Sequence, residues 1–151
     1  MNLAAFLISS KVYFEFLKKR PSQHALEASK ISGLTLSEIV KTIVFVDQNS
    51  KPMIAVVRGD RDVSRHKLQH CSNSKSVRLA SDDTAKAVTG YPTGGIPPVG
   101  HKKKLPVFID IEVMRHEYAW CGGGARTKLV RLRTEDIVKL NAATVCDIST
   151  D

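Results

Sequence analysis

Apolar residues gather in several short stretches of the chain, alternating with polar ones at 11–17 and nearly continuous at 41–47 and 52–59, and these stretches predict strands. The predicted strands cover residues 11–17, 41–47, 52–59, 76–79, 105–111 and 129–132. The polar stretch 47–51 has turn chemistry, so the strands on either side of it are expected to form a hairpin.

Capping residues and glycine stops predict short helices between these strands. Ser22 is expected to cap a helix that ends at Gly33, Thr35 opens a second capping signature, and Ser81 caps a third helix. Further helices are predicted at residues 2–9, 61–70 and 134–140. The irregular mixture, without a repeat or a linker, predicts one α+β domain over residues 1–151 with a mixed, mostly antiparallel sheet.

Composition adds a positive charge to this picture. The 151 residues are 42% hydrophobic, and 23 Lys and Arg face 15 acidic residues, for a formal net charge of +8. Such an excess attracts phosphate polyanions and raises their encounter rate. A basic surface that serves only solubility is the alternative, and charge alone leaves both open.

Cysteine usage and hydropathy bear on the compartment. Cys71, Cys121 and Cys146 are odd in number and share no metal-ligand spacing, so neither a disulfide framework nor a metal site is expected. The histidines show no metal-binding pattern either. The apolar stretch 3–8 is too short to span a bilayer and lacks the features of a signal peptide. We therefore expect a cytoplasmic protein with no membrane partner.

The segment 89–100 is the first candidate for chemistry. It holds four glycines and three prolines in twelve residues. Glycine allows close approach of a ligand and proline stiffens the chain, so the segment can present bare main-chain groups to a carbonyl or ester oxygen. A plain surface turn is the alternative.

Lys41 is the second candidate, because it stands directly before a β-branched apolar strand. A lysine at the mouth of a buried strand can hold a carboxyl, carbonyl or phosphate oxygen. An ordinary solvated lysine is the alternative, and it is the commoner one.

Two further segments follow the same logic. The glycines at 122–124 come after a predicted strand and can cradle a ligand, although their spacing matches no nucleotide-binding motif. Cys121 beside them is expected to be a buried structural residue rather than a nucleophile. The lysines at 102–104 can contact a phosphate backbone or form a solvated charge run.

Several of these segments, in order, resemble the YbaK/EbsC family of aminoacyl-tRNA editing domains, which are associated with prolyl-tRNA synthetase. The matching segments are residues 24–28, 39–45, 89–100 and 105–110, together with the glycines near 123 and residues 130–137. The resemblance covers nearly the whole chain. It implies a compact α+β fold around a barrel-like sheet with surrounding helices.

The resemblance also implies an activity, which is hydrolysis in trans of the ester that joins a wrong amino acid to tRNA. Catalysis in the family is thought to use the ribose hydroxyl of the substrate and an ordered water, with no cofactor. By this resemblance the partner is aminoacyl-tRNA, and an aminoacyl-tRNA synthetase is a candidate second partner. The acid that some members carry after the glycine-rich segment is missing from residues 125–129 here.

The implied roles fall on particular positions. As a hypothesis, Lys41 anchors the substrate while loop amides around Gly95 stabilise the oxyanion. The residues assigned to catalysis are Lys41, Gly95, Ile96 and Pro98. The residues assigned to substrate binding are Thr42, Gly94, Pro97, Gly122 and Gly123, and those assigned to tRNA are Lys102, Lys103 and Lys104.

Two other functions remain open at this level. A non-catalytic RNA-binding module would use the same basic charge, and a pocket protein for a free amino acid or nucleotide would use the same loop. Lys41 together with the intact loop favours the hydrolase, because a pure binder needs no such pair.

Overall fold

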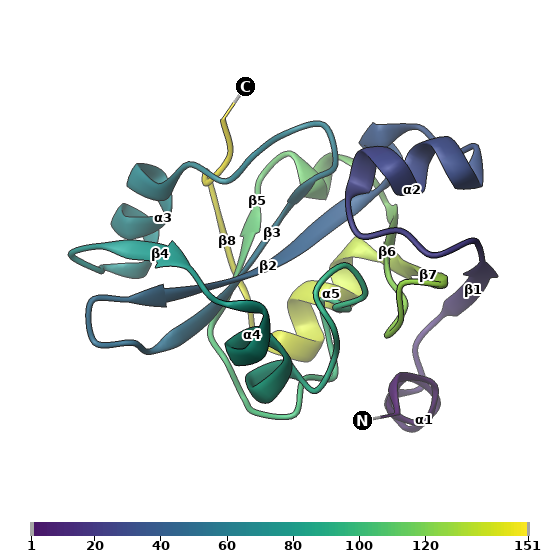
Figure 1. Ribbon diagram of the computed structural model, residues 1–151, viewed down its shortest axis with the longest axis horizontal. Helices are drawn as coiled ribbons and strands as arrows, with labels where there is room; N and C mark the ends of the chain where they lie inside the picture. The colour runs from purple at the N-terminus through teal and green to yellow at the C-terminus, as the bar shows by residue number, and fades with distance from the viewer. Residues whose placement is uncertain (1, 151) are drawn as a thin grey trace.

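The computed structural model describes residues 2–150, and over this range the chain forms five α-helices, two 3₁₀ helices and eight strands (Figure 1). The helices are α1 (Leu3–Ser10), α2 (Ala25–Ser32), η1 (Leu36–Glu38), α3 (Arg65–Ser72), α4 (Asp82–Thr89), η2 (Val113–Arg115) and α5 (Thr134–Asn141). The strands are β1 (Phe14–Lys18), β2 (Val40–Asp47), β3 (Pro52–Arg58), β4 (Val77–Leu79), β5 (Val107–Asp110), β6 (Tyr118–Gly122), β7 (Lys128–Arg133) and β8 (Thr144–Cys146).

The strands form two open sheets. One has the order β1-β7-β6 and is antiparallel throughout, and the other has the order β4-β2-β3-β5-β8. In the larger sheet β4, β2 and β3 are antiparallel, whereas β3, β5 and β8 are parallel. The predicted α+β class and the mixed, mostly antiparallel pairing are confirmed. The sheets are not closed into a barrel, so the expected barrel-like shape holds only loosely; a parallel bridge from Ile39 to Trp120 joins them.

The larger sheet carries apolar side chains on both faces, which divides the core in two. Ile54 and Val56 of β3 belong to the main cluster with Leu132 and Ile137, whereas the alternate residue Val57 packs in a second cluster. That second cluster also contains Phe45, Leu68 and Ile148. Successive strand residues point to opposite faces, which produces this division. The hairpin β2–β3 is therefore the central element, as the apolar runs predicted.

Several element boundaries differ from the prediction. α2 begins at Ala25 because Ser22 is buried and accepts a hydrogen bond from Lys19 Nζ instead of capping the helix. β1 begins only at Phe14, after α1 ends at a left-handed Lys11. β8 was not predicted, because three residues at the edge of a sheet carry too little pattern to be recognised. Gly33 does end α2, with φ of 78°.

The expectation of no disulfide is wrong. Cys71 at the end of α3 and Cys146 at the end of β8 form a disulfide across 75 residues of sequence. Their approach depends on the parallel pairing of β8 with β5, which the sequence did not predict. Cys121 is buried and free, as expected.

Candidate active site

The first residues of β2 lie beside β6, and this brings Lys41 next to the glycine segment. Ile39 pairs with Trp120 in parallel, and the two strands remain in contact. From that pair both chains run in the same direction, so Lys41 and Gly122, each two residues further on, lie at the same level. Alternation also points both residues to the same face.

The loop that contains Gly95 and Ile96 covers this face at Gly122. A side-chain Cβ on Gly122 would lie 2.3 Å from the carbonyl oxygen of Ile96 and 2.9 Å from the carbonyl carbon of Gly95. The main chain of the loop thus occupies the space above Gly122, on the face to which Lys41 points. Of the residues assigned from sequence, the packing brings together Gly95, Ile96 and Gly122, and the strand pairing places Lys41 at the level of Gly122.

Hydrogen bonds hold the loop in place from several sides. The amide of Gly95 donates to Pro92 at 2.9 Å, and the carbonyl of Gly95 accepts from the amide of Gly124 at 2.8 Å. Pro97 and Pro98 are also buried, and their carbonyls are engaged by His101 Nε2 at 2.7 Å and by Asn141 Nδ2 at 2.8 Å.

The amides of the loop are not equally available. The amide of Gly95 is occupied by Pro92, whereas among residues 2–150 no hydrogen bond takes the amide of Ile96. Prolines 97 and 98 have no N–H to donate. Among residues 94–98, the amides of Gly94 and Ile96 thus have no hydrogen-bond partner among the described residues, and Ile96 is one of the positions assigned to catalysis.

Lys41 is held only lightly. Its Nζ donates to Asp62 Oδ1 at 3.0 Å, with 23% of the Lys41 side chain and 86% of the Asp62 side chain exposed. Exposed ion pairs of this kind contribute about 0–1 kcal/mol, because water screens them and two side chains lose freedom. A substrate oxygen can therefore replace Asp62 as the hydrogen-bond partner of the Lys41 ammonium at a small cost in free energy. Asp62 was missed at the sequence level, since it lies 21 residues from Lys41.

Thr42 and Gly123 lie apart from this face. Thr42 shares the opposite face of β2 with Val40 and Val44, and its hydroxyl is buried with no hydrogen-bond partner among the described residues. Gly123 donates to the carbonyl of Lys128 and lines a pocket next to α1. Gly94 is exposed and packs against Gln23, with φ of 89°.

The three lysines after the loop are exposed. The amides of Lys102 and Lys103 donate to the carbonyls of Thr89 and Val88, so this short segment is fixed to the end of α4 while its side chains stay in solvent. Lys104 differs from the other two because it lines a hollow of about 330 Å³.

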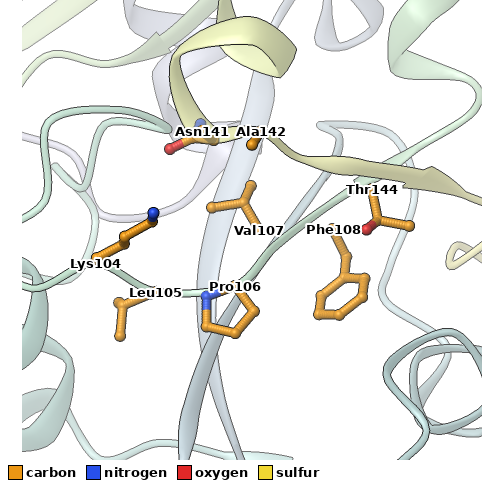
Figure 2. A pocket seen from close by; sticks show the side chains of 8 residues that line it. All are labelled: Lys104, Leu105, Pro106, Val107, Phe108, Asn141, Ala142 and Thr144. Carbon is orange, nitrogen blue, oxygen red and sulfur yellow. The ribbon is translucent and has the colours of Figure 1, made fainter.

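Figure 2 shows that hollow. The segment from Lys104 to Phe108 passes along one side of it, and Asn141, Ala142 and Thr144 lie across from that segment. Lys104 is the charged residue of its lining. Because Asn141 also donates to the carbonyl of Pro98, the hollow adjoins the loop at 94–98.

Burial changes the acidity of two groups near the loop. Desolvation lowers the pKa of His101, and the hydrogen bond to Pro97 opposes that shift only in part. Burial raises the pKa of the Cys121 thiol, which disfavours the thiolate that a nucleophile needs. The expected structural role of Cys121 agrees with this environment.

Residues 2–150 contain no group of three or more His, Cys, Asp or Glu side chains that could hold a metal ion. Over the same range, no helix is long and apolar enough to cross a membrane.

Comparison with known proteins identifies the family. Residues 20–140 match the model of the aminoacyl-tRNA editing domain. A candidate Cys-tRNA(Pro)/Cys-tRNA(Cys) deacylase of Enterococcus faecalis, EbsC, is 28% identical over 137 residues, which cover 91% of this chain and 84% of that protein. A proline–tRNA ligase of Geobacter metallireducens is 35% identical over 100 residues, which cover 66% of this chain.

The matched part covers only 17% of the ligase, so the ligase is much longer than this chain. A solved structure, of the hypothetical protein APE2540, superimposes with a TM-score of 0.90 at 26% identity and covers 98% of this chain and 99% of that one. The family model spans most of the chain, including Lys41 and the loop at 89–100. The chain therefore belongs to the family of aminoacyl-tRNA editing domains.

Proposed function

We propose that this chain is a deacylase that acts in trans on mischarged tRNA. The observation that carries the proposal is that the loop main chain at Ile96 packs over Gly122, at the level of Lys41 on the neighbouring strand, in a member of the editing family. A positive side chain and a free main-chain donor on one face are the two groups that an ester carbonyl needs as it gains negative charge.

The reaction is a hydrolysis in which water supplies the nucleophile. The water oxygen attacks the ester carbonyl carbon, and the carbonyl oxygen becomes an oxyanion near Lys41 and the amide of Ile96. The bond from carbon to the ribose oxygen then breaks, the electron pair passes to that oxygen, and a proton from the water reaches it. The neighbouring ribose hydroxyl of the substrate orients the water, so the protein needs no nucleophile of its own.

The positions assigned from sequence enter this proposal in two groups. Lys41, Gly95, Ile96 and Gly122 form the face on which the ester lies, and Pro97 and Pro98 fix the course of the loop. Gly94 borders the site and Thr42 points to the opposite face of β2, whereas Gly123 and the lysines at 102–104 lie outside the site and serve tRNA binding.

The finer points are parts of the same proposal. The chain works without a resident metal ion, its residues 1–151 form one editing domain, and it acts in the cytoplasm, where a prolyl-tRNA synthetase is a candidate partner. Treatment with a chelator should leave the rate unchanged. A chelator-sensitive rate that added Mg²⁺ or Zn²⁺ restores would remove the metal-free mechanism but not the deacylase activity.

A panel of mischarged tRNAs tests the activity directly. Cysteinyl-tRNA(Pro) belongs in the panel because the description of the Enterococcus relative names it. We expect the chain to release the amino acid from at least one mischarged tRNA faster than the spontaneous reaction, and to spare correctly charged prolyl-tRNA. Tight tRNA binding without release from any member of the panel would instead support the RNA-binding module.

A further inference from the structure

A pocket of about 380 Å³ lies between α1 and the ends of β1 and β7, on the other side of the smaller sheet from Lys41. Its walls are the rings of Phe16 and Tyr91, the glycine backbone at 123–124 and the side chain of Lys128. Nothing in the proposed reaction uses this pocket.

The register of β1 and β7 places a second lysine directly opposite Lys128, which lines this pocket. Lys18 is the cross-strand partner of Lys128, and both side chains are exposed. Like charges in directly opposed positions destabilise a sheet. Neither lysine is in an ion pair with a carboxylate among the described residues. A bound anion would relieve this repulsion.

The turn at residues 125–127 next to these lysines offers further donors. Among residues 2–150, no hydrogen bond takes the amides of Ala125, Arg126 or Thr127. Successive free main-chain amides form concave sites that bind anions. Arg126 is exposed as well, and its Nε donates to the carbonyl of Thr93. Residues 125–127, which lie where some family members carry an acidic residue, thus offer hydrogen-bond donors instead.

The aromatic walls suggest what else the ligand carries. Lys128 Nζ lies 5.8 Å from the centre of the Phe16 ring, and the ring of Tyr91 lies against Gly124. Nucleic acid bases stack on aromatic side chains, while lysines and free amides hold phosphates. Rings beside paired lysines therefore fit a nucleotide better than a bare inorganic anion.

The pocket is also linked to the candidate active site. The amide of Gly124 donates to the carbonyl of Gly95 at 2.8 Å, and the position of a Cβ on Gly95 is 2.7 Å from Ala125. The turn at 125–127 therefore packs on the loop that we assign to catalysis. A strand of RNA with its esterified end at Lys41 can pass around this end of the sheet.

We propose that this pocket binds a nucleotide of the tRNA substrate upstream of the esterified one, with its phosphate between Lys18 and Lys128 and its base against the partly exposed ring of Phe16, behind which Tyr91 is buried. This inference rests on the proposed function, because it takes tRNA as the substrate. It assigns a binding role to Lys18, Lys128 and the turn at 125–127.

Binding of a short single-stranded RNA that ends in CCA tests the site without any hydrolysis. Replacing both lysines (Lys18→Gln with Lys128→Gln) should weaken binding about tenfold, the loss typical of charge-assisted contacts. It should also reduce the slope of log K against log salt by about 0.7, the contribution of one phosphate contact to a single strand.

The matched control removes two exposed lysines at the opposite end of the molecule, Lys51→Gln with Lys75→Gln, near β3 and β4 (Figure 1). It should leave RNA binding within about twofold, as expected for distant charges that salt screens. Equal losses of RNA affinity in both double variants would mean that only net charge matters, and this would overturn the site. Unchanged RNA binding by the Lys18 and Lys128 variant would overturn it as well. Displacement of the RNA by inorganic phosphate as readily as by cytidine monophosphate would overturn the base-binding part.

Hydrolysis supplies a second readout. With mischarged tRNA, the Lys18 and Lys128 variant should raise KM about tenfold with kcat unchanged, and with aminoacyl-adenosine it should match the wild type. An equal loss on both substrates would place the lysines in the chemical step and overturn this inference. If the wild-type protein hydrolyses neither substrate, the deacylase proposal fails, while the RNA-binding result still decides the fate of this pocket.

Discussion

The loop at 94–98 and the first residues of β2 form two walls of the candidate site, and they hold their functional groups in different ways. In the loop the proposed functional group is a main-chain amide in a buried segment. The amide of Gly95 beside it donates to the carbonyl of Pro92, and the carbonyls of Pro97 and Pro98 accept from His101 and Asn141. In β2 the functional group is the long side chain of Lys41, held by one exposed carboxylate.

This difference indicates separate roles for the loop main chain and the Lys41 side chain in the proposed reaction. A main-chain donor that cannot move needs no reorganisation when charge develops, so the loop can stabilise an oxyanion from a fixed position. A lightly held ammonium can follow the substrate as it binds. Changes that move the loop should therefore reduce the rate strongly, whereas changes around the lysine that keep its charge should have small effects.

The largest of these effects is expected from Gly122→Ala. A Cβ there would lie 2.3 Å from the carbonyl oxygen of Ile96, so the loop must shift away from the face of Lys41. We expect deacylation to fall at least about 100-fold, the loss seen when one oxyanion donor is removed. Single-turnover release of the amino acid measures this.

Gly33→Ala is the control for that change. Gly33 has φ of 78°, but nothing lies within 4 Å of its Cβ position and it is remote from the loop in sequence. This variant should lose stability because of its left-handed backbone, with the deacylation rate of the folded protein unchanged. If Gly122→Ala also keeps its full rate, the loop does not need its present position.

An intermediate effect is expected from His101→Ala. This change leaves the buried carbonyl of Pro97 without its 2.7 Å partner. An unsatisfied buried acceptor costs about 1–3 kcal/mol, so we expect the free energy of unfolding to fall by that amount and the rate to fall about tenfold. Chemical denaturation and release assays measure the two quantities.

The contribution of His101 should depend on pH in a defined direction. Burial lowers its pKa in the folded state, so the unfolded chain takes up the proton first as the pH falls below about 6.5. The stability difference between wild type and His101→Ala should therefore shrink as the pH decreases from 6.5. A difference that grows on acidification would show that the folded state prefers the charged imidazole.

The smallest effect is expected from Asp62→Asn. The Lys41–Asp62 pair is exposed and contributes about 0–1 kcal/mol, so its loss should change the deacylation rate by less than about fivefold in either direction. A loss close to that of removing Lys41 itself would show that Asp62 positions the ammonium. The comparison of the two walls would then have to be revised.

The hydrophobic pattern predicted the central parts of the fold but not its long-range contacts. The hairpin β2–β3 was found because two short apolar runs and the turn chemistry between them are local signals. β8 and the disulfide from Cys71 to Cys146 were not found, because both depend on pairing between segments far apart in sequence. The α2 boundary was wrong because Ser22 is buried, with its hydroxyl bonded to Lys19 and its amide donating to the distant carbonyl of Arg126.

The same distinction applies to the candidate site. Lys41 and the loop at 89–100 were selected from their residue types and from the family resemblance. The free amide of Ile96, the partner Asp62 and the opposed lysines 18 and 128 required coordinates, because hydrogen bonding and strand register decide them. Lys102, Lys103 and Lys104 form a visible run in the sequence, whereas the opposed lysines stand 110 positions apart.

The central claim is that Lys41 and the loop together stabilise the oxyanion, and single-turnover deacylation by Lys41→Ala tests it most directly. The exposed Lys51→Ala in the β2–β3 turn serves as the control for loss of one lysine. We predict a fall of about 100- to 1000-fold for Lys41→Ala with an unchanged unfolding curve, and no change for the control. A folded Lys41→Ala protein that released the amino acid at nearly the wild-type rate would contradict the account.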